Sequence, residues 1–208
     1  MKAGNKRDPA KNRGRILASA LGEFARYGLG GARVDRIAAH AGANKRMLYY
    51  YFGNKEDLFL AVLESRYAHI RRAEQGLHLA DLDPAEGVRR LVAFTWNYYL
   101  EHPEFLTLLN SENLHRARHL RRSRQVAAMH SPLVATLGGL LERGARKGQF
   151  RRGVDPVQLY ISIAGLGYFY LSNRHTLSTI FQRDLLAARN KSERLRHMTE
   201  LVLGYLSK

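Results

Sequence analysis

Cationic and aromatic side chains crowd the short stretch between Gly42 and Gly53. Lys45 and Arg46 open it, and three consecutive tyrosines follow at positions 49–51. Cations bind phosphates and guanine edges, and tyrosine hydroxyls bond phosphate oxygens, so this combination is typical of contact with DNA. The stretch is therefore the first candidate for a functional site.

The residues around this stretch predict three consecutive helices. A short helix ends at Gly42, where a residue without a Cβ suits a sharp turn. Asn44 can cap the second helix, and Asn54 can cap a third. The apolar side chains expected to face the core of the first two are Val34, Ile37, Ala38, Ala41, Leu48 and Phe52. This order is typical of a helix-turn-helix DNA reader.

Positive charge is concentrated near this motif. The 208 residues carry a formal net charge of +16, and residues 1–55 hold 12 Lys and Arg against 3 Asp and Glu. Such a concentration fits a surface that displaces counterions from a phosphate backbone. In the alternative, the aromatic residues form a buried cluster and the cations a solvated face. The combined spacing of turn, cap, tyrosines and Lys55 favours DNA binding.

Helices are expected along the rest of the chain. Residues 1–12 are polar and basic and are predicted to form a flexible arm. A helix follows from Arg13 to Tyr27, and another from Lys55 to about Leu79. Further helix starts are predicted at Asp83-Pro84, Ser131-Pro132, Asp155-Pro156 and Asn190. Because no strand pattern of useful length occurs, the expected fold class is all-α, with about nine or ten helices.

Residues 13–60 resemble the DNA-binding head of the tetracycline-repressor (TetR) family of bacterial transcription regulators. The resemblance rests on Ile37-Ala38, Ala41-Gly42, Leu48-Tyr49, Tyr51-Phe52, Lys55 and Leu58. It implies a three-helix DNA-binding domain at 13–58, which a long helix joins to an effector-binding and dimerisation domain at 59–208. The residues expected to contact operator DNA are Arg33, Asn44, Lys45, Arg46, Tyr49, Tyr50, Tyr51 and Lys55.

Arg33 departs from the family pattern. It stands where the family commonly has a hydroxyl residue, and its guanidinium cannot accept a capping hydrogen bond. It can still reach a phosphate.

A helix over residues 155–173 is apolar nearly all round, so it needs partners on two sides. The resemblance implies that this helix pairs with residues 191–206 in a four-helix homodimer interface, where Gly165 and Gly167 allow close approach. Burial wholly within one subunit is the alternative. The expected interface residues are Tyr160, Ala164, Tyr168, Leu171, Met198, Leu201, Val202 and Tyr205.

Aromatic walls with a few amides suit a pocket for a small planar or amphipathic effector. The candidate lining residues are Trp96, Tyr99, Phe105, Asn110, Asn113 and Tyr168. Glu112, His115 and His119 could share a helix face, but the arginines within residues 116–124 oppose a metal ion. Neither metal nor cofactor is therefore expected. The arginine-rich segment is interpreted as a solvated basic loop, with an acidic partner as the alternative.

These features together favour a ligand-responsive repressor that a small effector releases from operator DNA. An architectural or protein-regulated DNA binder of the same fold is the alternative. An enzyme is not expected, because no nucleophile elbow, phosphate-binding loop or spaced metal set occurs. The chain has no cysteine, no secretory signal and no apolar run long enough to span a bilayer, which favours a cytoplasmic protein.

Overall fold

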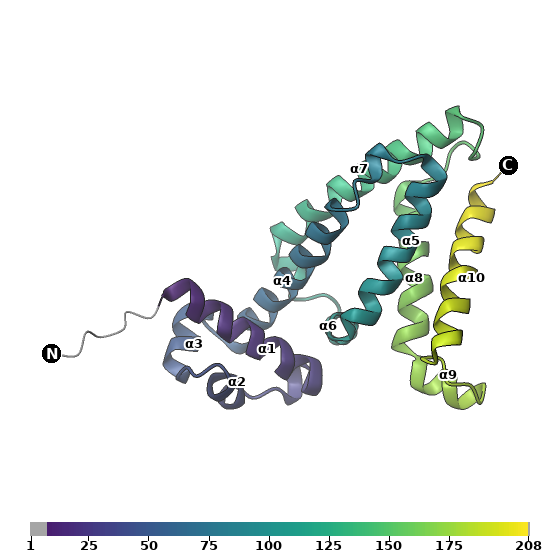
Figure 1. Ribbon diagram of the computed structural model, residues 1–208. Coiled ribbons are helices and arrows are strands. Elements are labelled where there is room, and N and C mark those ends of the chain that lie inside the picture. Colours follow the sequence, from purple (N-terminus) through teal and green to yellow (C-terminus); the bar gives the residue numbers. More distant parts are fainter. Residues whose placement is uncertain (1–7, 208) are drawn as a thin grey trace. The chain divides into compact units, whose positions relative to one another are not determined.

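The computed structural model describes residues 8–207, apart from the side chains of residues 127, 130 and 131. Regular structure in that part of the chain is entirely helical, which confirms the predicted all-α class (Figure 1). The α-helices are α1 (Pro9–Gly31), α2 (Val34–His40), α3 (Lys45–Phe52), α4 (Lys55–Gln75), α5 (Pro84–Glu101), α6 (Pro103–Leu114), α7 (Arg124–Arg146), α8 (Pro156–Ser172), α9 (Arg174–Ile180) and α10 (Ala188–Leu206). Two short 3-10 segments are η1 (Leu79–Asp81) and η2 (Leu120–Arg122).

The chain forms two compact units. The first contains the residues up to Tyr67 together with Thr107–Val126, and the second contains Ala68–Leu106 and the chain from Ala127 onward. The first unit thus extends past the boundary at residue 58 expected from the sequence. It includes a distant segment because Leu108 is buried in its core and Leu120 packs against that core.

The core of the first unit joins α1, α2, α3 and the start of α4. Phe24 and Phe59 meet edge to face, with ring centroids 5.1 Å apart. Ile37 and Leu48 contribute fully buried side chains from α2 and α3. Because fully burying one such side chain contributes about 1.5–3 kcal/mol, this shared core stabilises the arrangement of the short helices.

The first helix begins earlier than the sequence indicated. Asp8 Oδ1 accepts a hydrogen bond from Ala10 N at 2.9 Å, and Pro9 occupies the first helical position. The predicted flexible arm is therefore wrong for residues 9–12, which are helical, while residues 1–7 lie outside the described part. The Asp-Pro signal recognised at Asp83 and Asp155 also operates here, because proline needs no hydrogen-bond acceptor at a helix start.

Three other predicted helix boundaries need correction. Pro132 lies inside α7 and does not begin a helix, because the buried side chains of Leu133, Leu137 and Leu140 continue the packed stripe beyond it. Helix α4 ends at Gln75, before Leu79. Helix α10 begins at Ala188, and the Asn190 amide braces the preceding loop by donating to Asp184 O at 2.5 Å.

In the second unit, α5, α8 and α10 pack against one another (Figure 1). Trp96, Ile163 and Met198, one from each helix, are almost completely buried. Gly167 permits the close approach of α8 to α5, because a Cβ there would lie 3.2 Å from Cδ2 of Tyr99. None of the helices that the structure describes combines the length and hydrophobicity that a membrane crossing needs.

Candidate DNA-binding site and effector cavity

Helix α3 presents different side chains on its two faces. Leu48 and Phe52 are buried in the core of the first unit, as predicted. Lys45, Arg46 and Tyr50 are exposed, with 83% of Tyr50 accessible to solvent. The helix therefore offers cations and a tyrosine on the surface, held in place by its apolar side.

The turn before α3 depends on local capping and on a glycine. Gly42 has a φ of +57°, and a Cβ there would collide with the guanidinium of Arg15. That guanidinium donates a hydrogen bond to Ala41 O. Asn44 Oδ1 then accepts from Met47 N at 2.8 Å, which confirms the predicted cap. The cap leaves the Asn44 side chain occupied with its own helix.

Glu23 on α1 holds the start of α2, and the sequence reasoning missed it. Its buried Oε1 accepts from Arg33 N at 2.9 Å and from Arg36 Nε at 2.7 Å. Burial favours the neutral acid, but the Arg36 and Arg33 hydrogen bonds outweigh it, so the pKa of Glu23 is lowered. Glu23 thus anchors the backbone at Arg33 and the side chain of Arg36, while α2 has no side-chain cap and the Arg33 guanidinium remains exposed.

The other residues expected to contact DNA differ in their exposure and in their contacts within the chain. Tyr49 is exposed, whereas Tyr51 is half-buried against the core. Lys45 is ion-paired with Asp35, and Lys55 Nζ donates to Ala32 O at 3.2 Å. The structure therefore places Lys45, Arg46, Tyr49 and Tyr50 on the surface, whereas Lys55 is half-buried and bonded to the chain just before α2.

The arginine-rich segment is only partly the solvated loop that was predicted. His119 is buried, and its Nδ1 lies 2.6 Å from Glu112 Oε2. Arg118 pairs with Glu56, and Arg122 pairs with Asp57 at 2.5 Å. This segment is therefore held against the first turn of α4 by two ion pairs. Among the side chains that the structure describes, no cluster of three or more metal-ligating groups could hold a metal ion.

The six residues expected to line an effector pocket do not surround one common cavity. Trp96, Tyr99 and Phe105 are buried core side chains. Tyr168 is half-buried on α8, and Asn110 and Asn113 belong to the first unit, where Asn113 is exposed. None of the six lines the cavity between α4, η1 and α7. Aromatic composition marks a core and a pocket wall alike, so it could not separate the two.

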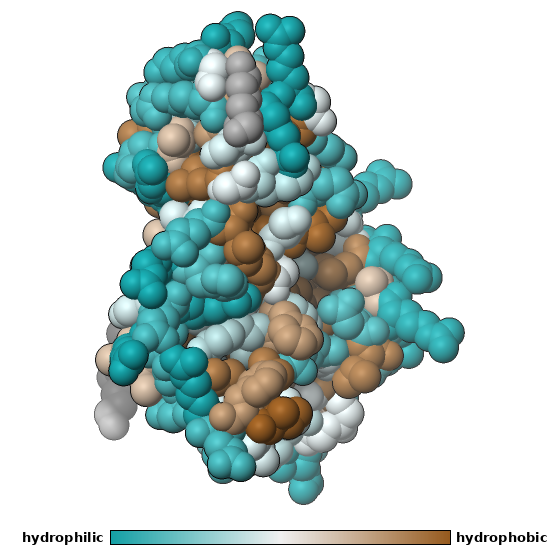
Figure 2. All heavy atoms as spheres, turned by 90° about the vertical axis from the view of Figure 1, so that its right-hand side faces the viewer, coloured by the Kyte–Doolittle hydropathy of each residue, from teal (hydrophilic) through white to brown (hydrophobic). Residues whose placement is uncertain are grey.

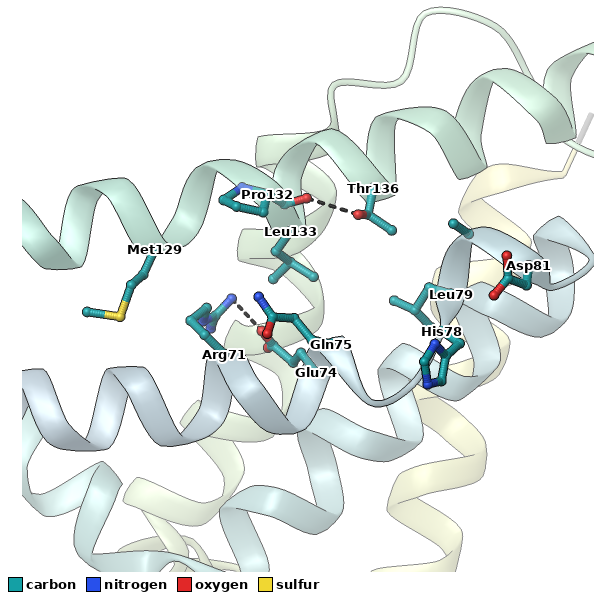
Figure 3. A pocket seen from close by; sticks show the side chains of 11 residues that line it. Arg71, Glu74, Gln75, His78, Leu79, Asp81, Met129, Pro132, Leu133 and Thr136 are labelled. Atoms are coloured by element: carbon teal, nitrogen blue, oxygen red, sulfur yellow. Dashed lines mark hydrogen bonds and ion pairs between the residues drawn. The ribbon is translucent and has the colours of Figure 1, made fainter.

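A cavity of about 240 Å³ lies in the second unit, between the end of α4, η1 and the middle of α7 (Figure 3). Arg71 and Glu74 line it from α4, and each is only 5% exposed. Their side chains form an ion pair, with Arg71 Nη1 2.7 Å from Glu74 Oε2. Arg71 Nη2 also donates to the Tyr160 hydroxyl at 2.8 Å, which fixes the guanidinium.

Burial of Glu74 makes the stability of this unit depend on pH. Burial raises the pKa of Glu74 from 4.5 to about 7, although the Arg71 charge acts in the opposite direction. Below pH 4.5 the carboxyl is protonated in both the folded and the unfolded states. Between pH 4.5 and 7 the unfolded carboxyl ionises first, so the folded state loses relative stability as the pH rises, by about 3 kcal/mol in total.

Replacing Glu74 by glutamine is expected to remove this dependence. Urea unfolding at pH 5 and pH 8 should show the E74Q variant gaining most of that 3 kcal/mol relative to the unmodified protein at the higher pH. Glu86→Gln, on the exposed side of α5, is the matched control and should show a much smaller change. An equal stability difference between E74Q and the unmodified protein at both pH values would contradict the assignment.

An apolar surface crosses α8 and α10 (Figure 2). We call it the α8/α10 face and define it by the exposed side chains of Val157, Ile161, Phe169, Leu201 and Tyr205. Only Leu201 and Tyr205 belong to the predicted interface set. Gly165, also exposed, has open space where a Cβ would stand. The exposed positions on α8 are spaced four residues apart and therefore share one side of the helix.

Several predicted interface residues face inward. Leu171, Met198 and Val202 are buried within the subunit, and Tyr160 bonds Arg71. Ala164 and Tyr168 are half-buried. The helix is apolar all round, so its sequence could not show which side the chain's own α5 and α10 would cover.

Comparison with known proteins agrees with this architecture. The family described as "Bacterial regulatory proteins, tetR family" matches residues 16–62, and "Tetracyclin repressor-like, C-terminal domain" matches residues 84–202. The HTH-type transcriptional repressor NicS of Pseudomonas putida is 43% identical over 193 residues, which cover 93% of this chain and 91% of NicS. The chain belongs to the TetR family.

Other TetR-family comparisons extend over less sequence or show the fold alone. The HTH-type transcriptional repressor SCO4008 of Streptomyces coelicolor is 43% identical over 109 residues, 52% of this chain and 53% of SCO4008. The solved structure of the transcriptional regulator FadR of Bacillus subtilis, in complex with stearoyl-CoA, has a TM-score of 0.67 and 15% identity. It covers 92% of this chain and 98% of that one.

In this TetR-family chain, the residues that sequence reasoning missed are buried charges. Glu23, Arg71 and Glu74 lie on helices among other charged residues, and their burial depends on the elements that pack over them. No local pattern in the sequence marks Glu23, Arg71 or Glu74 as buried.

Proposed function

We propose that this TetR-family regulator is a repressor that binds operator DNA as a homodimer in the cytoplasm. A small effector would release it by occupying the cavity beside Arg71 and Glu74. The observation that carries the DNA-binding part is α3, whose Arg46, Tyr49 and Tyr50 side chains are exposed while Leu48 and Phe52 anchor it. Such a helix suits the major groove, where arginine reads guanine edges.

The cavity supports control by a small molecule over control by a protein partner. A sealed second unit would have favoured the architectural DNA binder. The cavity has instead a polar wall on α4 and apolar side chains on α7, which are the features of a ligand site. Helix α4 also begins at Lys55 in the DNA-binding unit, so the same helix contributes to both sites.

The α8/α10 face supports the homodimer. Scattered single apolar side chains are ordinary on a surface, but here five large ones share two adjacent helices. A two-fold dimer buries the same face of both subunits and presents two DNA-binding helices to two half-sites. The expected DNA partner is therefore a palindromic operator.

Gel shift with DNA flanking the gene for this protein tests the proposed function. The unmodified protein should bind that DNA in preference to random DNA of equal length, and binding should weaken as salt rises. Equal affinity for both DNAs would contradict sequence-specific repression.

Two substitutions are expected to separate phosphate contact from base reading. Lys55→Ala should weaken binding about equally on operator and random DNA and lower the slope of log affinity against log salt by roughly 1. Arg46→Ala should cost more on the operator than on random DNA, because it also removes a base contact. Fluorescence anisotropy at four salt concentrations measures both effects, with Arg89→Ala on α5 as the control. An equal loss on both DNAs from Arg46→Ala would rule out its role as a base reader.

A further inference from the structure

The wall of the cavity carries buried polar atoms that have no hydrogen-bond partner within the described chain. They are Arg71 Nε and Nη1 and both carboxyl oxygens of Glu74. Arg71 Nη1 lies close to Glu74 Oε2, but this ion pair provides no hydrogen bond of good geometry. Buried polar groups in proteins are nearly always satisfied, so donors and acceptors left open at a cavity wall indicate a ligand that supplies the missing partners.

Arg71 is held ready for an anion. Its Nη2 donates a hydrogen bond to the Tyr160 hydroxyl. The guanidinium carbon Cζ lies over the Tyr160 ring, 5.4 Å from the ring centroid. These contacts fix the guanidinium, while Nε is buried without a hydrogen-bond partner in the described chain. A rigid guanidinium with open donors matches the planar geometry of a carboxylate.

Glu74 adds an acceptor to the same wall. Burial raises the pKa of Glu74, so its carboxyl neutralises Arg71 less completely than an exposed glutamate would. Its ionised form can accept only, which suits a hydroxyl or N–H group on the ligand. Figure 3 shows both side chains lying between α4 and α7, across from Leu133.

The remaining wall sets the size and polarity of the ligand body. Leu79, Met129, Pro132 and Leu133 provide apolar surface, and the other polar side chains of the wall are Gln75, His78, Asp81 and Thr136. The cavity, at about 240 Å³, is smaller than the 300–1,000 Å³ that drug-sized ligands commonly occupy. It therefore suits a single ring or a short chain, and it is too small for a long acyl chain.

On the basis of the effector role assigned above, we propose that the cavity binds a small monocarboxylic acid bearing a hydroxyl or amino group. The carboxylate accepts hydrogen bonds from Arg71, and the hydroxyl or amino group donates to Glu74. The apolar body of the acid lies against Leu79 and Leu133.

Titration calorimetry on the full chain tests the proposal with matched probes. The acids are benzoate, 3-hydroxybenzoate, 4-hydroxybenzoate and 3-aminobenzoate, and each is compared with its primary amide. At least one substituted acid should bind with a Kd below 1 mM and about tenfold tighter than benzoate, because a hydrogen bond to a charged group adds that much. The amides should bind at least about 30-fold more weakly than the acids. If no acid binds at 10 mM, or if an amide matches its acid, the proposal is wrong.

Variants assign the two contacts. Arg71→Met should weaken binding of every acid at least about 30-fold. Glu74→Gln should leave benzoate unchanged or tighter and abolish the advantage of the substituted acids. The double variant R71M/E74Q removes both charges together, so it keeps the Arg71 test valid if R71M alone does not fold. Arg89→Met on α5 is the control and should bind all acids normally. Acid binding that survives in both R71M and the double variant would overturn the site.

Operator binding separates this proposal from the proposed function. If the protein binds its operator and none of the acids, the ligand assignment fails while repression stands. If an acid binds and operator affinity does not change, the acid site exists but is not the effector site. If the protein binds no operator, the proposed function fails whatever the calorimetry shows.

Discussion

Replacing Phe169 by aspartate is expected to convert the proposed homodimer into monomers and to weaken operator binding at least about 100-fold. Phe169 lies on the α8/α10 face with 60% of its surface exposed in the single chain. In a dimer it would be buried against a second copy, where an unpaired carboxylate is strongly unfavourable. Loss of the second DNA-binding helix then removes the gain from simultaneous binding to two half-sites.

Sedimentation velocity and fluorescence anisotropy measure the two consequences of this change. The variant should sediment as a monomer, and its affinity for a single half-site should equal that of the unmodified subunit. Leu114→Asp is the matched control, because Leu114 is 84% exposed on α6 and lies outside the α8/α10 face. A Phe169→Asp protein that remains dimeric would show that the interface lies elsewhere.

Replacing Glu112 by alanine is expected to lower the free energy of unfolding of the first unit by about 3–5 kcal/mol. Glu112 Oε1 accepts from His119 N and Leu120 N, both at 2.9 Å, and Oε2 lies 2.6 Å from His119 Nδ1. Both side chains of this pair are buried, and the His119 ring packs edge-on against Phe59. Truncation would leave two backbone donors and the imidazole Nδ1 without partners in the core.

Urea unfolding followed by far-UV circular dichroism measures this loss. Trp96, the only tryptophan of the chain, lies in the second unit, so its fluorescence should change less than the dichroism. Glu56→Ala breaks the exposed ion pair with Arg118 and should lower the free energy of unfolding by at most about 1 kcal/mol. A similarly small loss of unfolding free energy for Glu112→Ala would show that the Glu112–His119 pair does not stabilise the first unit.

Local sequence signals predicted much of the DNA-binding unit. The caps at Asn44 and Asn54, the glycine turn at Gly42 and the inward side of α3 follow from interactions between residues a few positions apart. Such interactions are visible in sequence because their partners are fixed by helix geometry. A capping residue followed by proline also predicted a helix start at Ser131-Pro132. That prediction was wrong, because Pro132 lies inside α7.

The helical class, the helix-turn-helix and the exposed Arg46, Tyr49 and Tyr50 of α3 could all be predicted from the amino-acid sequence. The covered side of α8, the contact of Glu23 with Arg33 and the place of Arg71 and Glu74 in a cavity wall became visible only in the folded structure. These features depend on residues far apart in the chain, such as Arg71 and Tyr160. A side chain's burial is set by the elements that pack over it, so a charged residue on a helix gives no local sign of whether it faces water or a ligand.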